Sequence, residues 1–183
     1  MRPVRLCYAV MLVCSLSSCE FHCSVGSSGS VNTKPVTSND SSPVSGAVIK
    51  NDIELEANDV KLKEAYLYDD NDAVLTKNET GLGQKIHLAL RTDTGWVKEN
   101  GLSFIGASER ISTSGGKVIV DAPDIFKDYE TTGLPADKAV DITLSARITE
   151  AAGDDNNYLV QFRVWDKKGK GEIKGKYKFS LKK

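Results

Sequence analysis

From Val48 onward, apolar and polar residues alternate, and this alternation limits the possible folds more than any other feature. In the cleanest segment, from Val140 to Ile148, every second residue is apolar. Val60 and Leu62 are followed in the same parity by Tyr66 and Tyr68. A period of two places alternate side chains on opposite faces of a strand, and half-buried antiparallel strands need it. The sequence therefore predicts an all-β domain in which these residues face the core.

Turn signals separate the alternating segments and set the expected number of strands. Glycine, aspartate and asparagine favour turns because they supply positive φ or bond their own backbone. They cluster at 69–72, 81–83, 114–116, 153–157 and 168–171. Short strands with regular turns predict an antiparallel β-sandwich, immunoglobulin-like, with about seven to eight strands.

At most one short helix is expected, and it should follow Asp121. The segment Asp121-Ala122-Pro123-Asp124 offers a cap and an early proline, and Ile125, Phe126 and Tyr129 follow at helical spacing. We interpret this segment as a crossover between two strands.

The first residues look like an export signal. Arg2 and Arg5 precede an uncharged and mostly apolar run from Leu6 to Leu16. A run of this length suits the apolar region of a signal peptide, whereas a membrane span takes about 20 residues. All four cysteines lie before residue 24, so no disulfide can hold the domain together.

The apolar run ends in Leu16-Ser17-Ser18-Cys19, which resembles the lipobox of bacterial lipoproteins. The resemblance implies a diacylglyceryl thioether on Cys19, cleavage before it, and acylation of the new amino group. Several acyl chains together anchor stably in a membrane, whereas one does so marginally. In Gram-negative lipoproteins an aspartate after this cysteine favours inner-membrane retention; Glu20 stands here, so the resemblance points to the outer membrane. The alternative is an ordinary secretory signal that leaves Cys19 unmodified.

These features divide the chain into three parts. Residues 1–18 form the predicted signal peptide, residues 19–47 the lipidated cysteine and a Ser-rich tether, and residues 48–183 the sandwich. Without residues 1–18 the net charge falls from −1 to −3. That charge gives no basic stripe for nucleic acid, so nucleic acid is not expected as a partner.

No metal or cofactor is expected. The domain holds no cysteine for a zinc site or a thiol nucleophile. The segment 166–173 resembles the start of a calcium loop, but Lys168 and Lys170 stand where oxygen ligands belong, so a hairpin turn is predicted. The acidic turns at 69–72 and 154–157 could bind calcium, although their composition equally suits plain turns.

Three further side chains could carry function. His87 is the single histidine of the domain, on the polar parity of its strand, and a Ser-His-Asp triad would have to use it. No Gly-x-Ser-x-Gly nucleophile elbow is present, and we expect no catalytic residue. Trp96 and Trp165 are candidate ligand contacts, since an exposed indole can stack on a sugar or anchor a partner. The alternative is that both pack, Trp96 under a loop and Trp165 against Arg163 or into the second sheet.

The sequence therefore predicts a lipoprotein of the bacterial envelope that is not an enzyme. It would act as a binding or structural module, meeting a protein or glycan through loops or a sheet edge. The alternative is a small envelope hydrolase that uses carboxylates. A concave pocket with convergent polar groups would favour the hydrolase.

Overall fold

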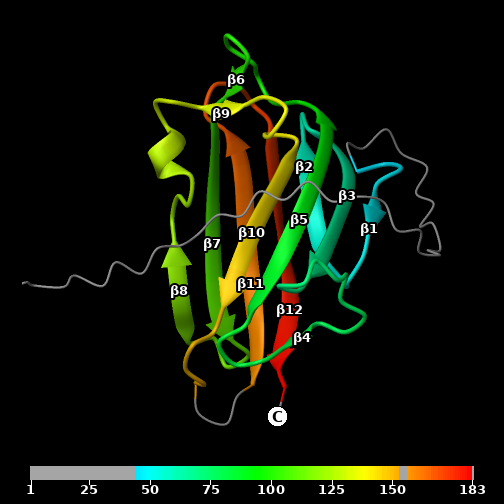
Figure 1. Cartoon of the computed structure of the whole chain (residues 1–183), viewed down its shortest axis with the longest axis vertical. Helices are drawn as coiled ribbons and strands as arrows, with labels where there is room; N and C mark the ends of the chain where they lie inside the picture. Colours follow the sequence, from blue (N-terminus) through cyan, green and yellow to red (C-terminus); the bar gives the residue numbers. More distant parts are fainter. Residues whose placement is uncertain (1–43, 153–155, 183) are drawn as a thin grey trace, which may run out of the picture.

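The computed structural model describes residues 44–152 and 156–182, and their fold is the predicted all-β sandwich (Figure 1). Sheet A has the strand order β1-β3-β5-β10, and sheet B has the order β2-β12-β11-β7-β8, with β4 beside β12. Within the described residues, eight strands have five residues or more, which matches the expected number.

The strands of sheet A are β1 (Val48–Ile49), β3 (Lys61–Tyr68), β5 (Lys85–Thr94) and β10 (Asp141–Arg147). Those of sheet B are β2 (Glu54–Asn58), β4 (Glu79–Thr80), β7 (Ile105–Thr113), β8 (Val118–Ala122), β11 (Asn157–Asp166) and β12 (Glu172–Leu181). The short strands β6 (Leu102–Ser103) and β9 (Leu134–Pro135) pair with each other.

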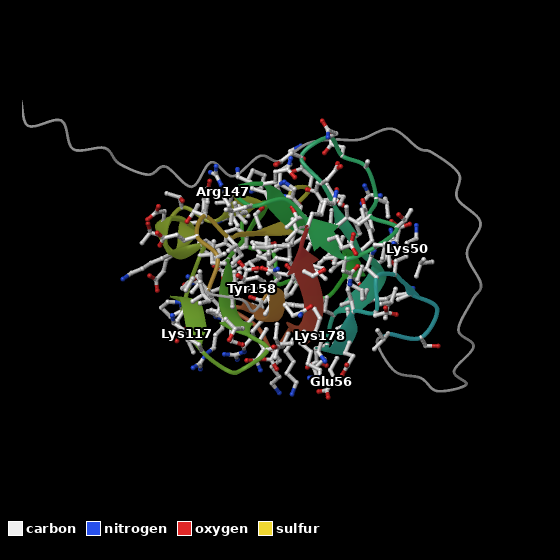
Figure 2. The ribbon with its side chains drawn as sticks, turned by 90° about the horizontal axis from the view of Figure 1, so that it is seen from below. Lys50, Glu56, Lys117, Arg147, Tyr158 and Lys178 are labelled. Atoms are coloured by element: carbon white, nitrogen blue, oxygen red, sulfur yellow. The ribbon has the colours of Figure 1, made fainter. Side chains whose placement is uncertain are left out.

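The alternation of apolar and polar residues in the sequence identifies which side chains form the core. In β10, Ile142, Leu144 and Ala146 are buried, and they pair with the buried Leu90, Leu88 and Ile86 of β5. Figure 2 shows Tyr158 of β11 between the sheets, whereas charged side chains such as Glu56 and Lys178 surround the outside. A buried leucine or isoleucine contributes about 1.5–3 kcal/mol relative to exposure, so this apolar layer holds the fold without a disulfide.

The last long strand, β12, lies inside sheet B. It pairs with β11 on one side, with β2 on the other, and with β4 at its end. Glu54 near the start of the described chain thus pairs with Lys176 near its end.

In β3 the prediction that Tyr66 and Tyr68 face the core was wrong. The pairing of β3 with β5 slips between Lys61 and Glu64, which marks a β-bulge. A bulge inserts an extra residue and reverses the parity that follows. Leu62 is therefore buried before the bulge, Ala65 and Leu67 are buried after it, and both tyrosines lie on the outer face.

The expected helix is reduced to one 3-10 turn, η1 (Lys127–Tyr129). Asp121 belongs to β8, where it pairs with Arg110, so it caps nothing. Asp124 accepts the Phe126 amide on its Oδ1 at 3.0 Å, but η1 itself has no side-chain cap hydrogen bond. No helix among residues 44–152 and 156–182 is long and apolar enough to cross a membrane.

The expected signal peptide, Cys19 and most of the tether lie outside the described residues. Val44 and Ala47, which precede the predicted domain start, are partly buried and pack against the core.

Candidate functional site

His87 lies on the outer face of sheet A, at the centre of a row that crosses three strands. The strand register places Tyr68 of β3 on one side of it and Ser145 of β10 on the other. The adjacent row along the strands is Tyr66, Ala89 and Thr143. We call Tyr66, Tyr68, His87, Thr143 and Ser145 the tyrosine–histidine face.

The imidazole of His87 is held on both nitrogens and on one ring face. Its Nδ1 lies 2.7 Å from the Ser145 hydroxyl, and its Nε2 lies 3.1 Å from Asp70 Oδ1. The Tyr68 ring stacks on it, with centroids 4.8 Å apart and planes 19° apart. These three contacts fix the orientation of the ring on an otherwise open sheet.

Asp70 reaches the row from the turn after β3. Its Oδ2 accepts the Lys85 amide at 3.1 Å while its Oδ1 meets His87. Partial burial acts to raise the pKa of Asp70, but the hydrogen bonds from Lys85 and His87 outweigh it, so the pKa is lowered. Asp70 thus stays ionised beside His87 at neutral pH.

The second row is arranged around a small residue. Ala89 is buried although it lies on the outer face. The Tyr68 hydroxyl extends across β5 to the Thr143 hydroxyl, 3.2 Å away. A larger side chain at position 89 would compete with Tyr68 for this space.

Tyr66 lies between two cations at the edge of the face. The Lys50 ammonium is 5.8 Å from its ring centroid, and the Arg91 guanidinium carbon is 5.5 Å from it. Burial raises the pKa of the Tyr66 hydroxyl even though Arg91 acts against it. Arg91 in turn pairs with Glu64 at 3.3 Å and with Asp141 at 3.6 Å, so charges of both signs border the face.

The Asp70–His87–Ser145 row differs from the triad of serine hydrolases. In those enzymes the serine bonds Nε2 and the carboxylate bonds Nδ1, and backbone amides stabilise the oxyanion. In this row the order is reversed, because Ser145 lies on Nδ1 and Asp70 lies on Nε2. The backbone amides of β10 lie in the plane of the sheet, whereas the side chain of Ser145 extends above that plane. The contacts of His87 fix the orientation of aromatic rings, and they do not place backbone amides where an oxyanion would form.

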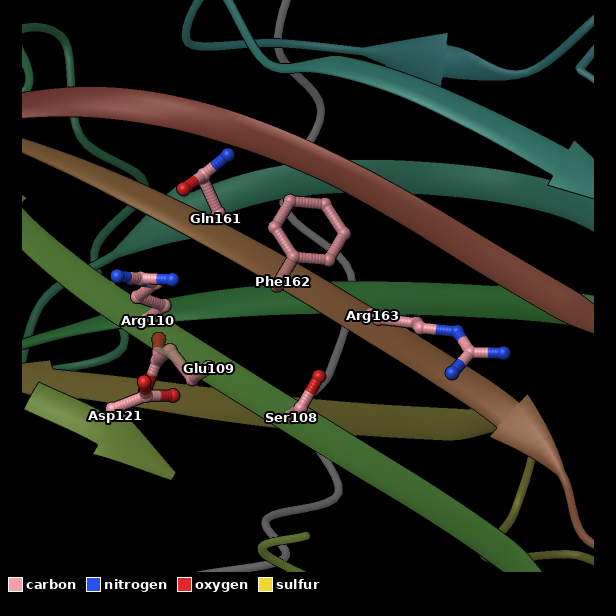
Figure 3. A pocket seen from close by; sticks show the side chains of 7 residues that line it. All are labelled: Ser108, Glu109, Arg110, Asp121, Gln161, Phe162 and Arg163. Atoms are coloured by element: carbon pink, nitrogen blue, oxygen red, sulfur yellow. The ribbon is translucent and has the colours of Figure 1, made fainter. Parts of the chain in front are cut away.

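A hollow of about 260 Å³ lies on the other side of the molecule, over β7, β8 and β11 of sheet B (Figure 3). It is lined by Ser108, Glu109, Arg110, Asp121, Gln161, Phe162 and Arg163. Figure 3 shows that Arg110 and Arg163 point in opposite directions along the strands, so the guanidinium groups do not converge.

The carboxylates at this hollow do not face each other either. Glu109 falls on the core-facing parity of β7 and is buried, whereas Asp121 is exposed on β8. Burial raises the pKa of Glu109 to about 7. A pair of carboxylates needs a shared substrate position to act as acid and base, and this arrangement offers none.

Of the two candidate tryptophans, Trp96 is not available to a ligand. Its side chain is buried, and its indole N–H donates to the Thr92 hydroxyl at 3.1 Å. Trp165 is partly buried on the outer face of sheet B. A Cβ on Gly106 would lie 2.2 Å from the Trp165 ring, so the indole rests on β7 at a position that only glycine allows. Arg163 lies over that ring, 5.0 Å from its centroid, as the packing alternative predicted.

The predicted hairpin at 166–173 is confirmed. The Asp166 amide donates to the Gly171 carbonyl at 2.8 Å. The Asp166 carboxylate is buried and accepts the amides of Val97 and Lys168, at 2.6 and 2.8 Å. Its oxygens thus serve the turn rather than a cation.

In the acidic turn at 69–72, Asp69 bonds within the turn, while Asp70 bonds Lys85 and His87. Asp69 accepts the amides of Asn71 and Ala73 at 2.9 and 3.0 Å. Residues 153–155 of the other acidic turn lie outside the described part of the chain. Among the described residues, no group of three or more His, Cys, Asp or Glu side chains could hold a metal ion.

No family model matches the sequence, and no curated protein matches it. The chain is similar to the crystal structure of the C-terminal domain of wzt, with a TM-score of 0.47 and 10% sequence identity. The match covers 79% of this chain and 88% of that chain.

Proposed function

We propose that this protein is a lipid-anchored binding module of the bacterial cell envelope that catalyses no reaction. Its anchor would be the lipid on Cys19, in the outer membrane rather than the inner one. Its recognition surface would be the tyrosine–histidine face, in place of the loops or sheet edge that the sequence suggested.

One observation carries this proposal: the face holds three aromatic rings and two hydroxyl side chains in fixed positions. His87 is constrained by Ser145, Asp70 and Tyr68, and Tyr68 is constrained by Thr143. Fixed side chains lose little conformational entropy when a partner binds.

The alternative, a hydrolase, has less support. Glu109 and Asp121 lie on opposite faces of their sheet, and the nitrogens of His87 are used in the reverse of the hydrolase order. The hollow over sheet B does not bring its charged groups together (Figure 3). Binding without chemistry therefore fits these arrangements better.

Photo-crosslinking in cells would test the proposal. A photoreactive amino acid at Arg147, which is exposed on β10 beside the face, should capture a partner of any chemical class. The matched control is Lys176, exposed on the outer face of sheet B. An adduct from position 147 alone is the expected result. Equal adducts from both positions, or none from position 147, would contradict a recognition role for the face.

A further inference from the structure

We propose that the tyrosine–histidine face takes a neutral, hydroxyl-rich ligand, namely a glycan segment without charged groups. This inference rests on the proposed function and adds the class of ligand. Three properties of the face lead to it: its rings, its hydroxyl groups and its balance of charge.

The rings suit the apolar side of a sugar. Tyr66 and Tyr68 lie side by side on β3, with centroids 6.0 Å apart and planes 51° apart. The side chain of His87 is 13% exposed and stacks on Tyr68, so it positions that ring rather than offering a surface of its own. An aromatic ring carries negative charge on its face and attracts the weakly positive C–H groups of a pyranose. Two tilted rings separated by this distance present a ridged surface that follows a chain of sugar units better than a single flat group.

The hydroxyl groups suit the polar side of the same sugar. Thr143 and Ser145 extend from β10 beside the rings, and each hydroxyl can donate one bond and accept two. The hydrogen bonds that the structure assigns to them use part of this capacity. The Tyr66 hydroxyl has no hydrogen-bond partner among the described residues, so it too can meet a ligand hydroxyl.

The charges around the face favour a neutral ligand. Carboxylates and cations alternate around it: Glu64 and Asp141 pair with Arg91, and the charge of Lys85 acts on Asp70. An anion would meet these carboxylates, and a cation would meet Lys50 and Arg91 beside Tyr66. Opposite charges this close nearly cancel beyond about one Debye length, so the face attracts neither ion.

A protein partner suits the face less well. Hot spots of protein interfaces are desolvated apolar or aromatic anchors seated in pockets. The one aliphatic residue of the central rows, Ala89, is buried beneath its neighbours. Neither the hollow over sheet B nor a smaller cavity of about 60 Å³ beside Asp70 and Lys85 is lined by a tyrosine or histidine of the face.

The test measures binding of the full chain to two probes. One is a set of neutral hexasaccharides built from glucose, mannose and galactose, and the other is the polysaccharide extracted from the envelope of the cells that make the protein. Tyr66→Ala should weaken binding by about tenfold or more, whereas Tyr66→Phe, which keeps the ring, should stay within about threefold. The matched control is Tyr129→Ala, because Tyr129 is an exposed tyrosine on η1, away from the face.

Ionic strength provides a second readout. Binding of a neutral ligand should change by less than about twofold between 50 and 500 mM salt, since no charge is neutralised. Steep weakening by salt would overturn the inference and indicate an anionic ligand. Binding that is equal in Tyr66→Ala and the native chain, or absent with both probes, would also overturn it.

The outcomes separate this inference from the proposed function. If position 147 captures a protein while neither probe binds, the face is a recognition surface and the glycan inference is wrong. If position 147 captures nothing and the probes do not bind, both fail.

Discussion

At the scale of single residues, Glu109 is the most unusual side chain of the core. It points inward from β7 and is 5% exposed, and its Oε1 has no hydrogen-bond partner among the described residues. The Tyr177 hydroxyl is also buried without a hydrogen-bond partner among these residues. Burial raises the pKa of Tyr177, and the nearby Glu109 carboxylate raises it further. Burial of an unpaired carboxylate disfavours the ionised form, which is why the pKa of Glu109 is raised from 4.5 to about 7.

This raised pKa predicts a protein that becomes less stable as pH rises. The folded state binds the Glu109 proton more tightly than the unfolded state, so the stabilisation is complete below pH 4.5 and is lost as pH rises through about 7. The shift corresponds to about 3 kcal/mol. Glu109→Gln should remove this fall in the free energy of unfolding, measured by urea unfolding at pH 5 and pH 8.

A matched control for this prediction is Glu56→Gln. Glu56 is exposed on β2 and pairs with Lys174 at 3.0 Å, so its replacement should leave the difference between the two pH values nearly unchanged. If native protein and Glu109→Gln lose stability in parallel between pH 5 and pH 8, Glu109 is not the group responsible.

At the scale of elements, the β11–β12 hairpin depends on one carboxylate. Asp166 connects the hairpin to the segment after β5 by accepting the Val97 amide, and it also accepts the Lys168 amide. Hydrogen bonds to a charged group contribute about 1.5–3 kcal/mol each, and part of that is recovered from water when they are lost.

Asp166→Ala should therefore lower the free energy of unfolding by about 2–4 kcal/mol. Asp166→Asn, which keeps one acceptor oxygen, should cost less. Thermal and urea unfolding measure both, with the exposed Asp137→Ala as the control. A loss below about 0.5 kcal/mol in Asp166→Ala would mean that water replaces these hydrogen bonds without cost.

The pairing of the strands shows how much of this fold the sequence can predict. Where pairing is regular, as between β5 and β10, the period of two identifies the core residues. In β3 it fails for Tyr66 and Tyr68, because a bulge depends on how the strand fits its neighbour and leaves no local signal in one sequence.

The candidate site was only partly predictable for a related reason. His87 stands out because it is the single histidine of the domain. Its neighbours Tyr68 and Asp70 come from β3 and the turn after it, whereas Ser145 comes from β10, 58 residues beyond His87. Which residues face each other across strands is set by register, and no pattern within one strand specifies that. Two tyrosines spaced by one residue were the one signal that could have directed attention to the face.

At the scale of the whole molecule, the proposed membrane anchoring depends on one cysteine. Cys19→Ala should abolish labelling of the chain by a fatty-acid analogue and leave a precursor that keeps residues 1–18, because the thioether forms on that thiol alone. Cys23→Ala is the matched control and should be labelled and processed normally. Unchanged labelling and membrane association in Cys19→Ala would contradict the lipoprotein hypothesis.

The position of β12 inside sheet B has a consequence for when the molecule can fold. Strand β12 lies between β2 and β11, so β2 lacks its neighbour in the sheet until residues 172–181 have been synthesised. Pairing between such distant segments must first overcome the entropy of closing a long loop, which slows folding. A growing chain therefore cannot complete sheet B until β12 has been made. For the exported lipoprotein that we propose, this delay would leave time for a translocation channel to receive the chain unfolded.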